Sequence, residues 1–290
     1  MYKLMICVGV LLAASLTANA VTVYAPNGLE RPLDGPDSLI TFDTNDPTNY
    51  TTVGSMNVPD IGFGGMDFDA DGNLWAYASL YKSTGGAAGG LYSVNMATGQ
   101  ATPQGTLSTQ SLDDIAFNPV DGQMYGIRSQ FTTTRLFTIN LTTGAVSLVG
   151  SFTGLPQTQR NVGFAIDSQG AFYLHDVGED VIYKGDGMAM SELYQLTQDT
   201  NFQQGMTIDW SRDDMGYHPA VGYGEYPHYF SQLNTFTTDG SSYVLGPEFG
   251  PDNPGDGLPP VECGDVAVVP IPEPSSLLLL LSVGALLRRR

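Results

Sequence analysis

Apolar and polar residues alternate in short runs along this chain, and one such pattern is repeated. It runs from Leu91 to Gly105 and again from Leu136 to Gly150, and each copy alternates, turns at a Thr-Gly pair and ends at a glycine. Alternation with a period of two on either side of a turn predicts a β-hairpin with one buried face. Looser copies run from Leu39 to Gly54 and from Phe230 to Gly246, with a degenerate copy near 192–203.

A second pattern lies between copies of the first. It joins an apolar run to an aromatic run through a turn rich in Asp, Asn and Gly, which also predicts a hairpin. Its copies are 65–75, 114–125 and 163–173, with a worn copy at 205–210. Two hairpins in each repeat of about 48 residues make a four-stranded sheet, which is the blade of a β-propeller.

We therefore predict an all-β fold, a β-propeller of about five four-stranded blades, over residues 21–269. A β-sandwich or an irregular β-helix with similar hairpins is the alternative. Ring closure stays open, because either Val21–Tyr24 or Asp265–Val269 could supply the missing strand. Residues 246–260 are rich in Gly and Pro and indicate a loop. The Leu-Tyr-x-Ile…Thr-Gly and Asp-Gly-x-Leu-Tyr motifs resemble those of known bacterial propellers, which implies an architecture and no particular activity.

The N-terminus has the features of an export signal. Lys3 precedes an apolar run from Leu4 to Leu16, and the small residues Ala18 and Ala20 follow it. These features predict a signal peptide over 1–20 that signal peptidase removes, and an apolar N-terminal helix before removal.

The C-terminus combines a Pro-Glu-Pro motif, an apolar run and a basic end. Pro272, Glu273 and Pro274 precede a hydrophobic segment at 275–287, and Arg288, Arg289 and Arg290 follow it. The purely apolar part, from Leu277 to Leu287, would rise only about 16 Å as a helix, roughly half the hydrocarbon thickness of a bilayer. We therefore expect a temporary membrane tether with its arginines in the cytoplasm.

This arrangement resembles the PEP-CTERM sorting signal, over residues 270–290. The resemblance implies recognition by an exosortase, a membrane protease, in a bacterium that makes extracellular polysaccharide. The expected location is the inner membrane before processing, and the cell surface or the extracellular space afterwards.

Charge narrows the range of partners. Without Lys3 and the three terminal arginines the chain keeps 7 Lys and Arg against 30 Asp and Glu, a net charge of −23. Phosphate binding draws on a basic surface, so nucleic acid is not an expected partner. Cys263 is the only cysteine outside the signal peptide, which excludes a disulfide within the mature chain.

Asp67, Asp69 and Asp71 copy the opening of a calcium-binding loop. The loop lacks its closing ligand, because Ala78 stands where a bidentate Glu is needed. Turn chemistry explains Asp69 and Asp71, since the other repeats carry Asp, Asn or Gln there. We expect no cofactor, and calcium is the one candidate.

His175 and Asp176 could form an oriented general base. No nucleophile motif accompanies them in the sequence. The catalytic alternative is thus a propeller hydrolase or lyase acting on polysaccharide, with His175 and nearby carboxylates.

Residues 217–230 are rich in tyrosine and histidine, and Tyr223, Tyr226 and Tyr229 are the candidate binding residues. Their rings could stack on sugars, contact a protein, or fill the junction between two blades. We therefore expect an exported, exosortase-sorted protein that binds polysaccharide or protein without catalysis, with an enzyme or a structural matrix protein as alternatives.

Overall fold

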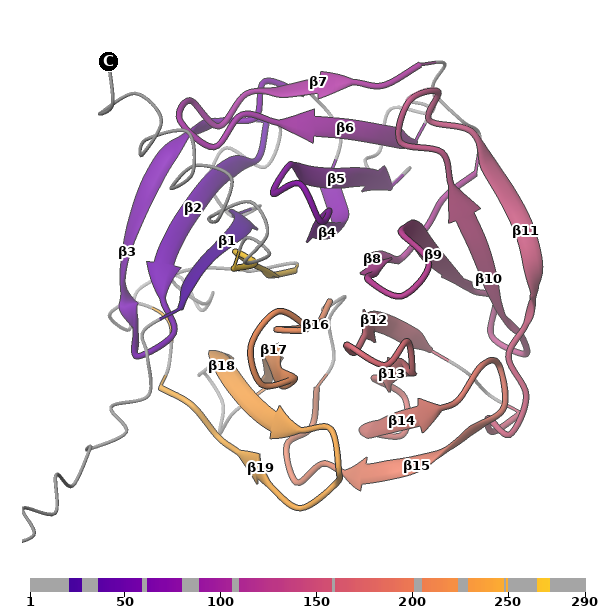
Figure 1. Ribbon diagram of the computed structural model, residues 1–290. Helices are drawn as coiled ribbons and strands as arrows, with labels where there is room; N and C mark the ends of the chain where they lie inside the picture. Colours follow the sequence, from indigo (N-terminus) through magenta and orange to yellow (C-terminus); the bar gives the residue numbers. More distant parts are fainter. Residues whose placement is uncertain are drawn as a thin grey trace, which may run out of the picture.

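The computed structural model describes residues 21–27, 36–58, 62–79, 89–105, 110–157, 160–200, 205–223, 229–247, 249 and 265–271. They form five four-stranded antiparallel sheets arranged as a ring around one axis (Figure 1). The predicted five-bladed β-propeller is confirmed, and the β-sandwich and β-helix alternatives are wrong.

We number the blades along the chain and give their strands from the axis outward. Blade 1 contains β20 (Ala267–Val268), β1 (Thr22–Asn27), β2 (Ser38–Asp43) and β3 (Asp46–Ser55). Blade 2 contains β4 (Gly62–Phe68), β5 (Leu74–Ser79), β6 (Gly90–Val94) and β7 (Ala101–Pro103). Blade 3 contains β8 (Asp114–Asn118), β9 (Gln123–Ser129), β10 (Thr134–Ile139) and β11 (Val146–Ser151).

The last two blades follow the same plan. Blade 4 contains β12 (Asn161–Ile166), β13 (Phe172–Asp176), β14 (Val181–Gly185) and β15 (Met190–Gln195). Blade 5 contains β16 (Thr207–Ile208), β17 (Met215–Tyr223), β18 (Tyr229–Thr237) and β19 (Tyr243–Val244). The outer hairpin of blade 4 is therefore β14–β15, which begins before the degenerate copy predicted near 192–203.

Both candidate closing segments join the same blade. β20 supplies the inner strand of blade 1 and pairs antiparallel with β1, with Val23 opposite Val268 and Tyr24 opposite Ala267. The first blade is thus completed by the last described strand. Closing the ring in this way joins the two ends of the domain through hydrogen bonds.

The turns after the inner strands explain why the repeats form hairpins. Oδ1 of Asp69 accepts the N–H groups of Asp71 and Asn73, and Oδ1 of Asp167 accepts those of Gln169 and Ala171. Such side-chain to backbone bonds hold a tight turn without help from other strands.

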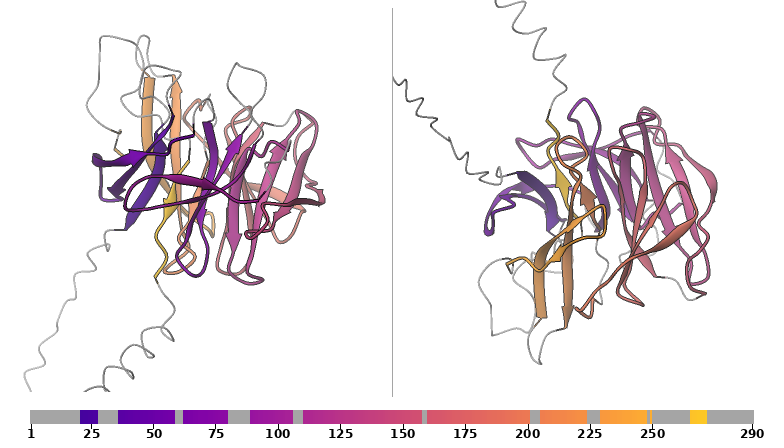
Figure 2. Two further views of the ribbon diagram at one scale, coloured as in Figure 1. Left: turned by 90° about the horizontal axis from the view of Figure 1, so that it is seen from above. Right: turned by 60° about the horizontal axis from the view of Figure 1, so that its bottom comes forward.

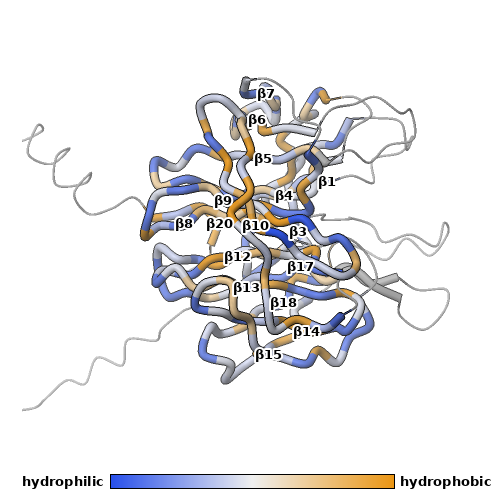
Figure 3. Tube along the Cα trace, turned by 90° about the vertical axis from the view of Figure 1, so that its right-hand side faces the viewer, coloured by the Kyte–Doolittle hydropathy of each residue, from blue (hydrophilic) through white to orange (hydrophobic). Residues whose placement is uncertain are grey.

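The core lies between blades. Each of five buried clusters joins the facing sides of two neighbouring blades; one cluster, for example, contains Phe164 of blade 4 and Leu136 of blade 3. In Figure 3 the hydrophobic residues follow the strands, and hydrophilic residues gather at the turns. Successive side chains of a strand point to opposite faces of the sheet, so they pack alternately against the two neighbouring blades.

The ring has two different faces, and the left view of Figure 2 shows the ring edge-on. The turn face carries the connections from each inner strand to the second strand, and the described chain starts and ends on this face, at Val21 and Ile271. The opposite face, which we call the loop face, carries the connections from the second strand to the third and from each blade to the next.

No helix occurs in the part of the chain that the structure describes, and no helix there could span a membrane. The predicted signal peptide, 1–20, and the predicted sorting segment from 272 onward lie outside the described residues. So do their residues Ala18, Ala20, Pro272, Glu273, Pro274, Arg288, Arg289 and Arg290.

Candidate functional site

Two aspartates close the centre of the ring. The first residues of the five inner repeat segments are Gly65, Asp114, Gly163, Gly205 and Asp265. The inner edge of each innermost strand has no partner strand, so its N–H groups need other acceptors. Asp114 accepts hydrogen bonds from the backbone N–H groups of Ile115 at 2.7 Å, Phe164 at 2.6 Å and Met206 at 3.3 Å.

Asp265 serves the other two blades. Its carboxylate accepts the N–H of Met66 in blade 2 and that of Val266 in its own segment. Together the two carboxylates bind one inner-edge N–H from each of the five blades. These hydrogen bonds tie the ring across its axis.

Glycine at the neighbouring positions gives these carboxylates their space. A Cβ atom at Gly205 would collide with Oδ1 of Asp265, and one at Gly65 would lie 2.5 Å from the backbone nitrogen of Ile115. Burial raises the pKa of both Asp114 and Asp265 well above the usual range, and the charge of Asp265 raises that of Asp114 further. The sequence pattern of aspartate and glycine at this position was the available signal for this arrangement, and sequence reasoning missed it.

Asp67 makes a smaller link of the same kind. Its Oδ1 accepts the N–H of Phe68 and its Oδ2 that of Phe117 in the next blade, both at 2.8 Å. Burial raises its pKa to about 7, against the opposing effect of these two N–H groups.

The calcium candidates do not converge on one point. Asp67 is bonded to the inner strands, whereas Asp69 is bonded to its own turn and to the indole of Trp75 at 2.9 Å. Asp71 is exposed on the turn. No group of three or more His, Cys, Asp or Glu side chains in the described ranges is arranged to hold a metal ion. These residues therefore do not fit a calcium loop.

His175 is buried and faces a second histidine. Its Nδ1 lies 3.0 Å from Nε2 of His218, and its Nε2 lies 3.3 Å from Oγ1 of Thr200. The two strands that carry these histidines, β13 and β17, occupy equivalent places in blades 4 and 5. Burial lowers the pKa of His218 to about 3, and burial followed by the nearby His218 lowers that of His175 well below its usual value.

The histidine pair continues into a longer polar network. On one side Thr200 donates to Asp180 at 2.6 Å. On the other, Nδ1 of His218 lies 2.9 Å from the hydroxyl of Tyr243, which also accepts a hydrogen bond from Asn234 at 2.9 Å. Every ring nitrogen of the pair thus has a protein partner, as buried polar groups require.

Asp176 does not orient His175. Its carboxylate accepts the N–H groups of Arg160 at 3.1 Å and of Gly178 at 2.8 Å, which holds the turn after β13. The proposed general-base pair therefore does not form in this structure. The histidine partner, His218, lies 43 residues away in sequence and carries no spacing that would have predicted it.

The tyrosine-rich stretch divides between two settings. Tyr217 is buried against blade 1, as expected of rings that fill a blade junction. Further along, Tyr223 and Tyr229 are paired backbone positions at the end of the β17–β18 hairpin, on the loop face. Tyr226 lies outside the described residues, as does Cys263.

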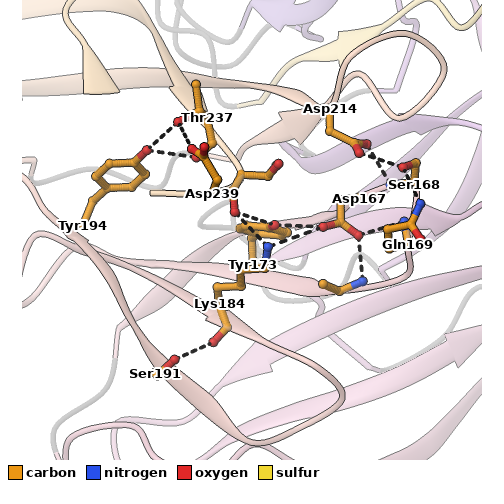
Figure 4. Close-up of polar contacts among 12 residues, drawn as sticks. Asp167, Ser168, Gln169, Tyr173, Lys184, Ser191, Tyr194, Asp214, Thr237 and Asp239 are labelled. Carbon is orange, nitrogen blue, oxygen red and sulfur yellow. Dashed lines mark hydrogen bonds and ion pairs between the residues drawn. The ribbon is translucent and has the colours of Figure 1, made fainter. Parts of the chain in front are cut away.

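A third polar cluster joins blades 4 and 5 on the turn face (Figure 4). Tyr173 donates to Asp167 at 2.8 Å, and the ammonium of Lys184 lies 3.8 Å from the same carboxylate and 5.1 Å from the centre of the Tyr173 ring. Asp214 of blade 5 accepts hydrogen bonds from the backbone and hydroxyl of Ser168. Each of these groups is bonded within the protein, so the cluster serves to hold the two blades together.

The loop face carries one aromatic side chain in an unusual position. Phe131, between β9 and β10, has a φ of 50° and is 68% exposed. The guanidinium carbon of Arg160 lies 6.0 Å from the centre of its ring. The two residues lie in two connections outside the repeated segments, β9–β10 and β11–β12, which is why the repeats gave no sign of the pair.

Comparison with known proteins agrees with this architecture. A family model described as a repeat of unknown function (DUF6923) matches residues 77–236, more than half of the 290-residue chain. No curated protein matches the chain.

Several solved structures are similar to this chain at low sequence identity. A crystal structure of a nidogen/laminin complex is 13% identical, with a TM-score of 0.51, over 88% of this chain and 99% of that one. TolB from Acinetobacter baumannii is 15% identical, with a TM-score of 0.45, over 87% and 67% of the two chains. A gluconolactonase from Xanthomonas campestris is 12% identical, with a TM-score of 0.43, over 79% and 77%. At these identities the likeness concerns the fold alone.

Proposed function

This chain belongs to the DUF6923 family of repeats, and we propose that it is an exported, non-enzymatic module that binds polysaccharide through the loop face of its propeller. The observation that carries the proposal is the contrast between the centre and the loop face. The central carboxylates accept backbone N–H groups and every ring nitrogen of the histidine pair has a protein partner, whereas the loop face exposes Phe131. Exposed aromatic rings on connections between strands are typical of binding surfaces.

The proposal includes export and sorting. Residues 1–20 would direct the chain across the inner membrane, and 270–290 would hold it there until an exosortase cuts near Pro272-Glu273-Pro274. The protein would then act at the cell surface or in the extracellular polysaccharide.

The position of the segment before Pro272 supports one orientation of the propeller relative to the membrane while the chain is tethered. Arg212 donates to the carbonyl of Val269 at 3.0 Å, and the N–H of Ile271 donates to the hydroxyl of Ser211 at 2.9 Å. Both bonds fix the segment before Pro272 to the turn face of blade 5. A tethered molecule would therefore direct its loop face away from the membrane.

Sorting is tested by changing the glutamate of the motif. We expect Glu273→Ala to leave the full-length chain uncut in the inner membrane, because the protease would lose a charged recognition group. Immunoblots of membrane and medium fractions measure this. The matched control is Glu192→Ala, which changes an exposed glutamate on β15 and should be released like the wild type. Normal release of the Glu273→Ala protein would contradict the sorting proposal.

Binding and catalysis are separated by one assay. Full-length protein immobilised on an affinity matrix and incubated with extracellular polysaccharide should retain the polymer and release no oligosaccharide. Retention of a protein instead of the polymer would point to a protein partner. Oligosaccharide release that is lost in a folded His175→Ala variant would show that the protein is an enzyme. If the protein neither binds the polymer nor releases oligosaccharide, the structural matrix protein is the alternative that remains.

A further inference from the structure

Phe131 adopts a backbone conformation that its side chain disfavours. Its φ of 50° is in the left-handed region, which is unfavourable for a residue with a bulky side chain. The N–H of Gln130 donates to the carbonyl of Thr133 at 2.9 Å and closes this turn. Glycine or asparagine would fit the same turn with less strain.

Burial does not compensate for that strain, because Phe131 is 68% exposed. Strained backbone conformations cluster at functional sites. The exposed ring on this strained turn is therefore a candidate for an interaction outside the domain.

The base of the turn is rigid. The N–H of Ser129 donates to Asp113 at 2.6 Å, and Oγ of Ser129 accepts the N–H of Asn161 in blade 4 at 3.2 Å. The side-chain amide of Asn161 donates to Thr134 at 2.8 Å, which ties the far side of the turn to blade 4 as well. Phe131 is thus presented by three strands of two blades, and little ordering remains to be done on binding.

Arg160 is held in the same way from blade 4. Its N–H donates to Asp176, and its carbonyl accepts the N–H of Val177, both at 3.1 Å. Its guanidinium approaches the ring of Phe131, and no carboxylate in the described part of the chain forms an ion pair with it. Arg160 is exposed, so its guanidinium can reach an acidic group of a ligand.

We propose that Phe131 and Arg160 form a binding site for an acidic sugar residue. The aromatic ring would stack on the apolar C–H face of the sugar, and the guanidinium would bind its carboxylate through paired N–H···O bonds. This inference rests on the proposed polysaccharide-binding function and adds the chemical class of the ligand and the two residues that select it.

The acidic surface limits which polymer fits. A chain of consecutive uronates would be repelled by the protein as a whole, whereas one carboxylate among neutral sugars meets mainly its nearest charges, since salt screens beyond about 8 Å. The site therefore matches a polysaccharide that carries isolated uronates. We expect its affinity to be maintained or to rise when salt increases from low to physiological concentration.

Calorimetric titration of the full-length protein tests the site. The probes are a tetrasaccharide of neutral hexoses with one glucuronate, and the same tetrasaccharide with that carboxyl group reduced to an alcohol. We expect Phe131→Ala to weaken binding of both probes by about tenfold or more. Arg160→Gln should weaken only the acidic probe, by about tenfold, to the level of the reduced one.

Matched variants keep the test specific. Arg135→Gln changes an exposed arginine on β10 of the same blade and should leave both affinities unchanged, and Phe131→Tyr should retain them. Unfolding midpoints equal to that of the wild type show that each variant is folded.

The outcomes separate this inference from the function on which it rests. If both Phe131→Ala and Arg160→Gln bind the probes as tightly as the wild type does, the site is wrong and the polysaccharide-binding function still stands. Loss of binding in Tyr229→Ala would then place the binding surface at the β17–β18 hairpin. Failure of the wild type to bind either probe or the whole polysaccharide would overturn both proposals.

Discussion

Replacing Asp114 with alanine is expected to destabilise the protein by about 3 kcal/mol or more. Its carboxylate accepts three inner-edge N–H groups, from blades 3, 4 and 5, and all three would be left in a buried position without an acceptor. Each such buried group costs roughly 1 to 3 kcal/mol. Relief of the repulsion from Asp265 and of the carboxylate's own burial offsets part of this loss.

Urea denaturation at neutral pH measures the effect, and two variants serve as comparisons. Asp114→Asn keeps one oxygen acceptor and removes the charge, so it should lose less than the alanine variant. Asp71→Ala changes an exposed carboxylate and should stay within about 0.5 kcal/mol of the wild type. An Asp114→Ala protein as stable as the wild type would mean that water replaces the carboxylate at the centre of the ring.

The blades could be predicted because their signals are local. A turn such as Asp69 to Asn73 is held by bonds within four residues, and alternation on either side of it fixes which side chains face each neighbouring blade. Such information repeats in every blade and can be counted along the sequence. At β14–β15 the Thr-Gly turn of the repeat is replaced by Asp186-Gly187. The hairpin was therefore predicted several residues C-terminal to its actual position.

The groups that meet across blades could not be located in the same way. His175 and His218 meet only because β13 and β17 occupy equivalent places in adjacent blades, and no spacing in the sequence records this. Asp114 and Asp265 were visible as exceptions in a column of glycines, but their role depends on the N–H groups of other blades. Phe131 and Arg160 lie in connections that differ from blade to blade, so no repeat draws attention to them.

The histidine pair should make the free energy of unfolding depend on pH, and the substitution His218→Gln should remove the contribution of His218 to that dependence. His218 has a pKa of about 3 in the folded protein and about 6.5 when unfolded. Between these values the unfolded state binds a proton that the folded state does not, so the contribution of His218 to stability falls as the pH falls from about 6.5. Between pH 7 and 4.5 this loss amounts to about 2.5 kcal/mol.

Buried carboxylates act in the opposite direction. The pKa of Asp67 is raised to about 7 and that of Asp113 to about 6, so the folded state takes up protons there before the unfolded state does. Their contributions to stability improve as the pH falls through these values toward about 4. The wild-type profile between pH 7 and 4.5 is therefore expected to be flatter than the histidines alone would give.

Comparing variants over the same pH range separates the two effects. His218→Gln removes one titrating ring, so the free-energy advantage of the wild type over this variant should shrink by about 2.5 kcal/mol between pH 7 and 4.5. Asp67→Ala, which restores the alanine found in two sister repeats, should show a difference of opposite slope. A constant difference between the wild type and His218→Gln across this range would mean that the folded protein accepts a proton at the histidine pair. The polar network between blades 4 and 5 would then have to open to water at mildly acidic pH, because a buried imidazolium needs either a counter-charge or solvent.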